Sequence, residues 1–366
     1  MFDMSNFTCP FCLRTYKKSM VKYICPDCGK EVKRKPWMGD KVKCEDGGIA
    51  SIRSCPKCDK TLPKAALETP NLPFSIVGVS GAGKTNFITV MMKELKNNGL
   101  NLTIGGQTTE TRNHQNEMER IIYNSYKDNM VPPSTNRDEI FPQIWYVRNN
   151  QKGNRNEVPT YTFTIFDGAG ESHEDIDPNS AEYRYINASK AIILTIDPLV
   201  FSSIVRGGFV DPSVLYNSRG GEVSEKDASE VINGVADYIK SARGISTNKK
   251  LDVPVAVVLT KIDTVLSHPA FGSHALIQSS SLNIRNGKVD LTEMQQVDME
   301  IRNWLYTIGE DAFINALNSN FKEYMLFGVS SLGAPPTDVD SFPKEIHPHR
   351  ILDPILWLFK REKFVS

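Results

Sequence analysis

The chain has 366 residues, enough for two or three domains with one sizeable core, and its 43 lysine and arginine residues are balanced by 43 aspartate and glutamate residues. No apolar run reaches the roughly 18 residues of a membrane span, and the N-terminus lacks a signal-peptide pattern, so we expect a cytoplasmic protein with no membrane span. The neutral total conceals an asymmetry, because residues 1–68 carry a formal charge of +6 and the remainder one of −6.

The cysteines all lie in the first segment, and six of them form the Cys-Pro-x-Cys pairs Cys9/Cys12, Cys25/Cys28 and Cys55/Cys58. Such clustering is typical of metal sites rather than of a disulfide framework. A CxxC turn directs two thiolates toward one point, so two turns complete a tetrahedral Zn²⁺ shell. The first pair could share zinc with the second, or with the third around an inserted loop. A second site with Cys44 would need a non-cysteine ligand, such as Asp59.

The zinc is expected to be structural, because nothing in the segment suggests a vacant ligand position or an acid–base partner. The same segment contains the basic run Lys33-Arg34-Lys35-Pro36-Trp37, with Lys41 and Lys43 close by. Basic residues around an aromatic side chain can bind nucleic acid, although they can also keep a thiolate-rich module soluble or contact a protein. We predict a zinc-binding module at residues 1–68.

The rest of the chain, residues 69–366, is predicted to be a nucleotide-binding domain, joined to the module by a proline-containing linker at residues 59–73. Phe74–Val79 is predicted to be a buried strand, and Thr85–Asn98 a helix that Gly99 ends. The sequence between them has the pattern G-x-x-x-x-G-K-T, which starts at Gly78. A strand, a glycine-rich turn and a helix in this order predict a phosphate-binding loop.

The chemistry of this loop explains its residues. Glycines let backbone N–H groups curl around a phosphate, and the helix N-terminus adds further N–H groups and a partial positive charge. Lys84 would reach the β- and γ-phosphates, and the Thr85 hydroxyl would bind Mg²⁺. The other loop residues expected around the phosphates are Ser80, Gly81, Ala82 and Gly83.

Further strands and helices alternate along the domain, which predicts an α/β fold with a mostly parallel sheet. The predicted strands are Asn101–Ile104, Ile140–Arg148, Thr160–Phe166, Ala191–Ile196, Val253–Leu259 and Glu323–Val329. The predicted helical spans are Thr111–Asn129, Leu291–Asn318 and Asp353–Phe359. The second and third of these strands are expected to form an antiparallel hairpin.

One predicted strand ends in Asp167-Gly168-Ala169-Gly170-Glu171. Asp167 could hold the Mg²⁺ shell, and the backbone N–H of Gly170 could contact the γ-phosphate. Asp197 also follows an apolar strand, but we prefer Asp167 because Gly170 and Glu171 follow it. Asp197 is instead expected to form a turn with Pro198.

The motif Thr260-Lys261-Ile262-Asp263 follows another buried strand and predicts guanine recognition. The Asp263 carboxylate can accept hydrogen bonds from N1–H and the exocyclic amine of guanine, a pair of donors that adenine lacks. The aliphatic part of Lys261 can lie over the base. Ser330 and Ser331 follow the next strand, where the backbone N–H of Ser331 could contact guanine O6.

The motifs GVSGAGKT, DGAGE, TKID and VSSLG resemble, in order and spacing, those of Ras-like, translation-factor-related P-loop GTPases over about residues 74–366. A closer resemblance is to bacterial TRAFAC-clade GTPases of the double-GTPase conflict-system type. Those also carry a CPxC-rich N-terminus, a D-x-A-G-E switch, a strand ending in Asp-Pro-Leu and a Leu-Trp-Leu sequence near the C-terminus. In this chain the last three features are Asp167–Glu171, Asp197–Leu199 and Leu356–Leu358. The resemblance implies GTP or GDP and Mg²⁺ as ligands, a protein effector or activator, and a role in bacterial defence or signalling.

Two features depart from the family pattern. The first switch lacks an obvious motif; by the family's spacing its Mg²⁺-binding threonine would be Thr135, with Thr108, Thr109 and Thr111 as alternatives. Glu171 stands where Ras-like members carry a glutamine that orients water. Hydrolysis is therefore expected to be slow or to need help from a partner or from an arginine in cis. The candidate arginines are Arg112, Arg120 and Arg137.

These observations predict a Mg²⁺-dependent GTP-hydrolysing switch whose mobile parts are roughly Thr108–Asp138 and Asp167–Tyr185. The alternatives are a GTP-binding scaffold that does not hydrolyse GTP, which Glu171 favours, and a nucleic-acid-associated GTPase that reads its target with residues 1–68.

Overall fold

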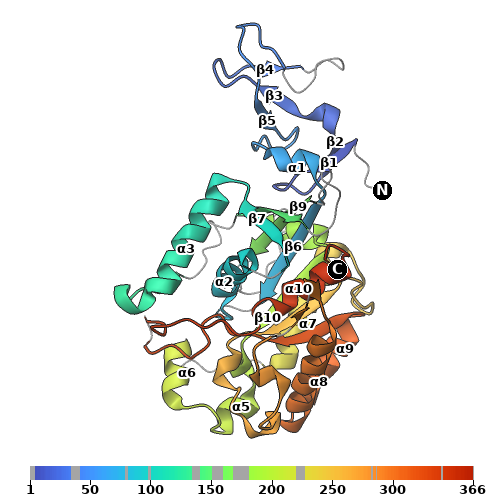
Figure 1. Cartoon of the computed structure of the whole chain (residues 1–366). Helices are drawn as coiled ribbons and strands as arrows, with labels where there is room; N and C mark the ends of the chain where they lie inside the picture. The colour runs from blue at the N-terminus through green and yellow to red at the C-terminus, as the bar shows by residue number, and fades with distance from the viewer. Residues whose placement is uncertain are drawn as a thin grey trace.

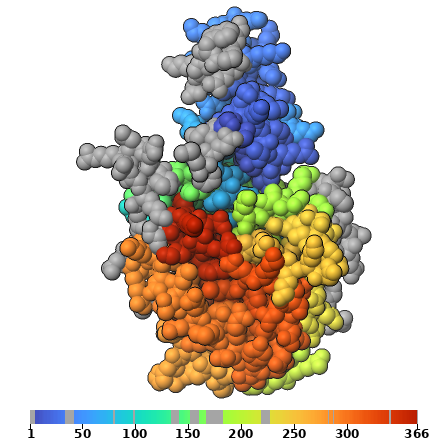
Figure 2. Space-filling model, turned by 90° about the vertical axis from the view of Figure 1, so that its right-hand side faces the viewer, coloured from blue at the N-terminus to red at the C-terminus, as the bar shows by residue number. Residues whose placement is uncertain are grey.

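The computed structural model describes residues 5–33, 42–78, 81–97, 100–133, 141–150, 160–167, 181–219, 227–281, 283–285, 287–338 and 341–365. A central sheet organises the larger part of the molecule, and a cysteine-rich module stands at one end of it (Figure 1). The space-filling view shows this module, in blue, projecting from the body of the molecule (Figure 2). None of the described helices is long and apolar enough to cross a membrane.

The central sheet has seven strands and is mostly parallel, as the sequence predicts. In spatial order the strands are β14 (Tyr324–Gly328), β11 (Val255–Leu259), β10 (Ala191–Ile196), β6 (Asn71–Gly78), β9 (Thr160–Asp167), β8 (Gln143–Asn149) and β7 (Leu102–Gly106). Only the pairings of β8 with its two neighbours are antiparallel among these strands, so the predicted β8–β9 hairpin pairing is confirmed.

Helices cover both faces of this sheet. One face carries α7 (Ala228–Arg243), α8 (Thr292–Thr307) and α9 (Asp311–Asn320), and the other carries α2 (Lys84–Lys96), α3 (Thr109–Asp128) and α10 (Asp353–Arg361). Every residue of β10 is buried because alternate side chains enter the two apolar cores. Burial on both faces explains why the central strands are continuous apolar runs in the sequence.

Shorter elements complete the domain at its periphery. They are the helices α4 (Ala181–Ala188), α5 (Ser202–Arg206) and α6 (Pro212–Arg219), and the two-stranded pair β12 (Ile284–Arg285) and β13 (Lys288–Val289). The helical span predicted over Leu291–Asn318 is divided into α8 and α9 around Gly309, whose φ of 83° ends the first helix.

The N-terminal module contains two small sheets. One is the hairpin β1 (Asn6–Thr8)–β2 (Thr15–Lys17), and the other has the order β4 (Glu31–Val32)–β3 (Lys22–Ile24)–β5 (Ile52–Ser54). Cysteines make up a large share of its core, which contains the buried Cys9, Cys25, Cys44 and Cys55. A module with so little apolar core needs another source of stability.

The expectation of a linker at residues 59–73 is wrong, because these residues are structured and connect the module to the sheet. Helix α1 (Lys64–Glu68) lies within this segment, and β6 begins at Asn71. Leu67 is buried in the core of the module. The hydroxyls of Thr69 and Thr162 are 2.8 Å apart, and the Thr162 N–H donates to the Pro70 carbonyl at 2.9 Å.

Tyr185 of α4 makes a second connection between module and domain. Its hydroxyl donates to the carbonyls of Pro10 and Phe11, at 2.8 and 2.9 Å. Its ring stacks on Phe166 of β9 with centroids 4.3 Å apart. Burial raises the pKa of Tyr185 well above its usual value, so the hydroxyl keeps the proton that it donates.

At the end of β6, Gly78 lies opposite Thr195 of β10. A Cβ atom on Gly78 would overlap both the hydroxyl and the carbonyl of Thr195. Glycine is therefore required here for strand pairing.

We predict that Gly78→Ala lowers the thermal stability of the nucleotide-free protein by the equivalent of roughly 1–3 kcal/mol, because the added methyl must separate the two strands. Gly234→Ala is the matched control. Gly234 lies in α7 with no neighbour within 4 Å of an added Cβ, so alanine should stabilise the helix by roughly 0.5–1 kcal/mol. Thermal melts of both variants test this, and equal shifts would contradict the requirement at Gly78.

Candidate functional site

The predicted site residues lie at the carboxyl ends of parallel strands. Gly78 ends β6, Asp167 ends β9, Asp197 follows β10, Thr260 follows β11, and Ser330 follows β14 after one further residue. Because these strands run in the same direction, all of these residues lie at one edge of the sheet. This is the edge at which open α/β sheets bind their ligands.

The glycine-rich loop leads from β6 into α2. Gly81 and Gly83 have φ values of 76° and 71°, which glycine adopts without strain. Gly83 is the N-cap of α2 and provides no side-chain cap, so the first turn of this helix can offer N–H groups to an anion. Thr85 is half-buried in this first turn.

Lys84 starts helix α2 and is buried. Its Nζ donates to the Gly78 carbonyl at 3.0 Å, so the ammonium group lies directly over the loop. This places a positive charge where a phosphate chain would enter the cradle. Ser80, also predicted to line the cradle, lies outside the described residues.

Thr260 joins the glycine-rich loop to the loop after β11. Its hydroxyl lies 2.8 Å from the Ala82 carbonyl and 3.1 Å from the Ile196 carbonyl. Its backbone N–H also donates to Ile196, at 2.8 Å. The side chain therefore fixes the phosphate loop relative to the predicted base-binding loop.

Lys261 is held by a buried carboxylate. Its Nζ is 2.9 Å from Oδ2 of Asp197, a residue with no exposed surface. The Lys261 stem runs beside the glycine-rich loop, because its Cε lies 3.9 Å from the Cβ position of Gly83. The turn predicted at Asp197 is confirmed, since its Oδ1 accepts from the Leu199 N–H at 2.9 Å. Its second role, positioning Lys261, was not predicted.

Asp263 lies half-buried in the short 3₁₀ helix η4 (Ile262–Thr264). Burial raises the pKa of its carboxyl group, and a hydrogen bond with the Ser330 side chain opposes that shift. The loop is anchored to β14 because the Ile262 N–H donates to the Val329 carbonyl at 3.0 Å. Ser330 in turn pairs its backbone with His349 in both directions. Ser331 follows it and is half-buried.

Part of the predicted machinery lies outside the described residues, namely Thr135, Arg137, Gly170 and Glu171. Asp167 is placed by its backbone alone, opposite Ile76 of β6. The structure therefore leaves the first-switch threonine and the water-positioning residue as predictions.

The alternative threonines and arginines of the first switch serve local structure. Thr108 caps α3 by accepting from the Thr111 N–H at 3.1 Å, and the Thr111 hydroxyl accepts from the Ile144 N–H at 2.9 Å. Arg112 donates to the Gly106 carbonyl at 3.0 Å. Arg120 pairs with Asp128, with 3.6 Å between Nη1 and Oδ2.

The three CPxC turns share one backbone design. The first cysteine of each accepts a hydrogen bond from the N–H four residues later, and that later residue adopts a positive φ. These later residues are Leu13 (55°), Gly29 (71°) and Asp59 (57°).

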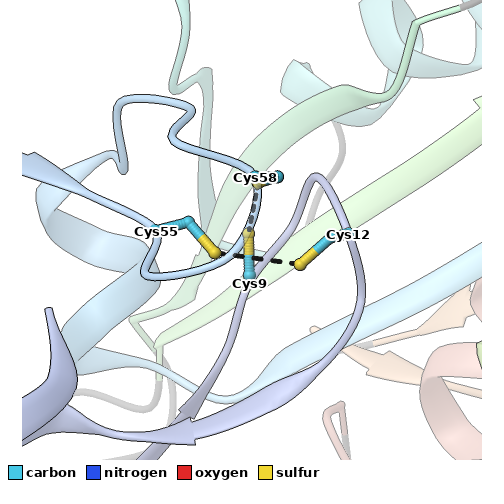
Figure 3. A group of neighbouring side chains, drawn as sticks. All are labelled: Cys9, Cys12, Cys55 and Cys58. Carbon is cyan, nitrogen blue, oxygen red and sulfur yellow. Dashed lines mark hydrogen bonds between the residues drawn. The ribbon is translucent and has the colours of Figure 1, made fainter.

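The first and third turns face one another, which decides between the two pairings left open by the sequence (Figure 3). The Sγ atoms of Cys9 and Cys58 are 3.9 Å apart, and those of Cys12 and Cys55 are 3.8 Å apart. An ideal tetrahedron of sulfurs around zinc has edges of about 3.8 Å, given a Zn–S bond of about 2.3 Å. The residues therefore fit a four-thiolate zinc site.

The remaining pair, Cys25 and Cys28, lies with Cys44 and with Asp46. The suggestion of Asp59 as a fourth ligand is wrong, because its carboxylate is 2.6 Å from Nζ of Lys22. The sequence contained a signal that could have identified Asp46 as the fourth ligand. Asp46 lies two residues after Cys44 and directly before the glycine pair Gly47-Gly48.

A family model described as Double-GTPase 2 matches residues 73–327. A curated relative from Mycolicibacterium smegmatis, named "Putative ESX-1 scaffolding and assembly protein SaeC", is 23% identical over 330 residues, which are 84% of this chain and 79% of the relative.

Two similar solved structures are a small GTPase and a GTPase-like domain. The Arl6 BBS3 small GTPase of Trypanosoma brucei, with a bound nucleotide analogue, has a TM-score of 0.32 and 11% identity, and the match covers 81% of this chain and 99% of that one. The GTP-bound Ski7 GTPase-like domain of S. cerevisiae has a TM-score of 0.33 and 14% identity, over 80% of this chain and 50% of that one.

We predict that Asp197→Asn weakens GTP binding by about tenfold, because it keeps the turn but removes the charge that positions Lys261. Asp211→Asn is the matched control, since exposed Asp211 accepts from the Ser213 N–H at 2.8 Å in a similar turn. Titration of both variants with a fluorescent GTP analogue tests this. Unchanged affinity in Asp197→Asn would show that Lys261 does not need the ion pair.

Proposed function

Since the chain belongs to the Double-GTPase 2 family, whose model matches residues 73–327, we propose that it is a Mg²⁺-dependent switch that binds and hydrolyses GTP. The observation that carries the proposal is the Thr260 hydroxyl bonded to Ala82, 2.8 Å away, which joins a phosphate cradle to a base-recognition loop. Its setting would be bacterial defence or signalling, with a protein effector or activator as partner.

The phosphate end of the site is assigned to the glycine-rich loop and α2. In this proposal the Lys84 ammonium group donates to the Gly78 carbonyl in the nucleotide-free protein. When GTP binds, it moves to the β- and γ-phosphates. Thr85 and Asp167 would hold Mg²⁺, which neutralises phosphate charge when it is bound. Loop N–H groups from Gly81 to Lys84 would bind the phosphate oxygens.

The base end of the site is assigned to the loops after β11 and β14. Asp263 would accept from the two guanine donors, and Ser331 would donate its N–H to O6. The Lys261 stem would cover the base while Asp197 holds its ammonium group 2.9 Å away. Because burial raises the pKa of Asp263, guanine binding should weaken as the pH falls toward that pKa, where the carboxyl becomes a donor.

The N-terminal module, residues 1–68, would be stabilised by zinc. Its contacts would change with the nucleotide bound to the domain, residues 69–366. Tyr185 supports this assignment. It is the last residue of the second proposed switch, and its hydroxyl donates hydrogen bonds to the first CPxC turn. Lys33 and Lys43 are exposed on the module, and a nucleic-acid partner would use them with the neighbouring basic run.

The second candidate function is a GTP-binding scaffold that does not turn over. The observation that favours it is the relative SaeC, whose name assigns that protein a scaffolding and assembly role. Single-turnover phosphate release separates the two candidates, because a scaffold would retain GTP.

Base recognition gives the first test. Asp263→Asn should weaken GTP binding by about 5- to 150-fold, because a guanine donor then meets an amide donor, at a cost of roughly 1–3 kcal/mol. The same variant should bind xanthosine triphosphate more tightly than the wild type does, since xanthine presents a carbonyl at C2. Equal affinity of the wild-type protein for ATP and GTP would overturn the guanine assignment.

Turnover gives the second test. Purified protein should hydrolyse GTP far below ~1 s⁻¹, because a site without an arginine finger forgoes roughly 10³–10⁵ in rate. A partner or self-association should stimulate it. If Arg137 acts in cis, turnover should be fast and Arg137→Ala should abolish it.

Glu171→Gln completes this test. Faster turnover would show that the carboxylate limits the wild-type rate, and a loss would show that Glu171 orients the water. Fast turnover that survives alanine at Arg112, Arg120 and Arg137 would contradict both the partner-activated mechanism and the mechanism with an arginine in cis.

A further inference from the structure

The outer end of the N-terminal module contains a second cluster of ligand atoms. Cys25 and Cys28 come from the turn after β3, and Cys44 and Asp46 come from the tight turn between Val42 and Ala50. The four ligand atoms lie within 4.8 Å of one another. This cluster is separate from the Cys9–Cys12–Cys55–Cys58 group and shares no residue with it.

The distances within this cluster match a mixed tetrahedral site. The Sγ atoms of Cys28 and Cys44 are 3.6 Å apart, close to the sulfur–sulfur edge of about 3.8 Å. The Sγ of Cys25 is 3.4 Å from Oδ2 of Asp46, where zinc–ligand bonds of about 2.3 and 2.0 Å give a sulfur–oxygen edge of about 3.5 Å. Both edges therefore have the length that one central zinc ion requires.

The backbone holds Asp46 in this position. The Gly48 N–H donates to Oδ1 of Asp46 at 2.8 Å, which leaves Oδ2 directed at Cys25. Cys44 closes the turn, because its N–H donates to the Gly48 carbonyl at 2.8 Å. A Cβ on Gly48 would come within 2.7 Å of the Asp27 carboxylate, 3.0 Å of the Asp46 carboxylate and 3.2 Å of the Cys25 sulfur, so a side chain here would crowd the cluster.

We propose that Cys25, Cys28, Cys44 and Asp46 form a second Zn²⁺ site, with three thiolates and one carboxylate. This site joins the turn after β3 to the Val42–Ala50 turn and stabilises the outer end of the module. It accounts for Cys44, which the four-thiolate site does not use. Bound zinc supplies the stability that the small apolar core of this end lacks.

The two sites differ in how accessible they are. Cys28 and Asp46 are exposed, whereas each ligand of the four-thiolate site is buried or half-buried. A chelator can therefore approach the second site directly. The second site should release its zinc first, and the first site should keep it longer.

Cadmium provides the direct test of ligand type, because the ¹¹³Cd chemical shift separates four-sulfur from three-sulfur-one-oxygen coordination. The full chain loaded with ¹¹³Cd should give one resonance of each kind. Asp46→Cys should move the second resonance into the four-sulfur region and leave the first unchanged. A single bound cadmium, or a second resonance that stays in place in Asp46→Cys, would overturn the assignment.

Metal release provides the test with matched controls. Zinc transfer from the full chain to a chromophoric chelator should show two phases, and Asp46→Ala should accelerate only the fast one, by about tenfold or more. Asp27→Ala is the control, because its Oδ2 lies 4.0 Å from the same Cys25 sulfur but outside the ligand group. Equal acceleration by both variants, or none by Asp46→Ala, would reject Asp46 as a ligand.

Discussion

The parallel pairing of β6 with β10 is the constraint on which the nucleotide site depends. Gly78 can approach Thr195 only because it has no side chain, and this approach sets where the phosphate loop leaves the sheet. From there Thr260 bonds to Ala82, and Asp197 at the end of the same β10 holds Lys261. One close contact between two strands thus helps to place both the glycine-rich loop and the loop predicted to bind the base.

The N-terminal module depends on a different source of order. Its core contains few large apolar side chains, and cysteines occupy much of the buried space. Three turns of one design present pairs of thiols, and a shorter turn presents Cys44 and Asp46. The proposed zinc ligation would replace apolar packing here, so that a small module could keep a defined shape.

The sequence predicted the elements whose signals are local. Strands β10 and β11 were predicted from continuous apolar runs. The loop residues Lys84 and Thr85 were predicted from the spacing of the G-x-x-x-x-G-K-T pattern. α1 was missed because a five-residue helix between prolines has no period to detect. Helix α7 was not predicted, although its buried residues follow a helical period.

The contacts that could not be predicted join residues far apart in the chain. The pair Lys261–Asp197 spans 64 residues, and cysteine spacing alone allowed two pairings of the CPxC turns. Such choices depend on the tertiary arrangement, which the spacing of a motif does not encode.

The contact of Tyr185 with the first CPxC turn also bears on how the chain is made. The last cysteine of the module is Cys58, and its second connection to the domain follows at Tyr185, 175 residues beyond Pro10. At common translation rates this interval lasts on the order of ten seconds. During this interval the module lacks the Tyr185 contact, so the zinc proposed for it would have to supply more of its stability. If the module binds zinc as proposed, metal supply during synthesis would help to determine how many chains reach their native state.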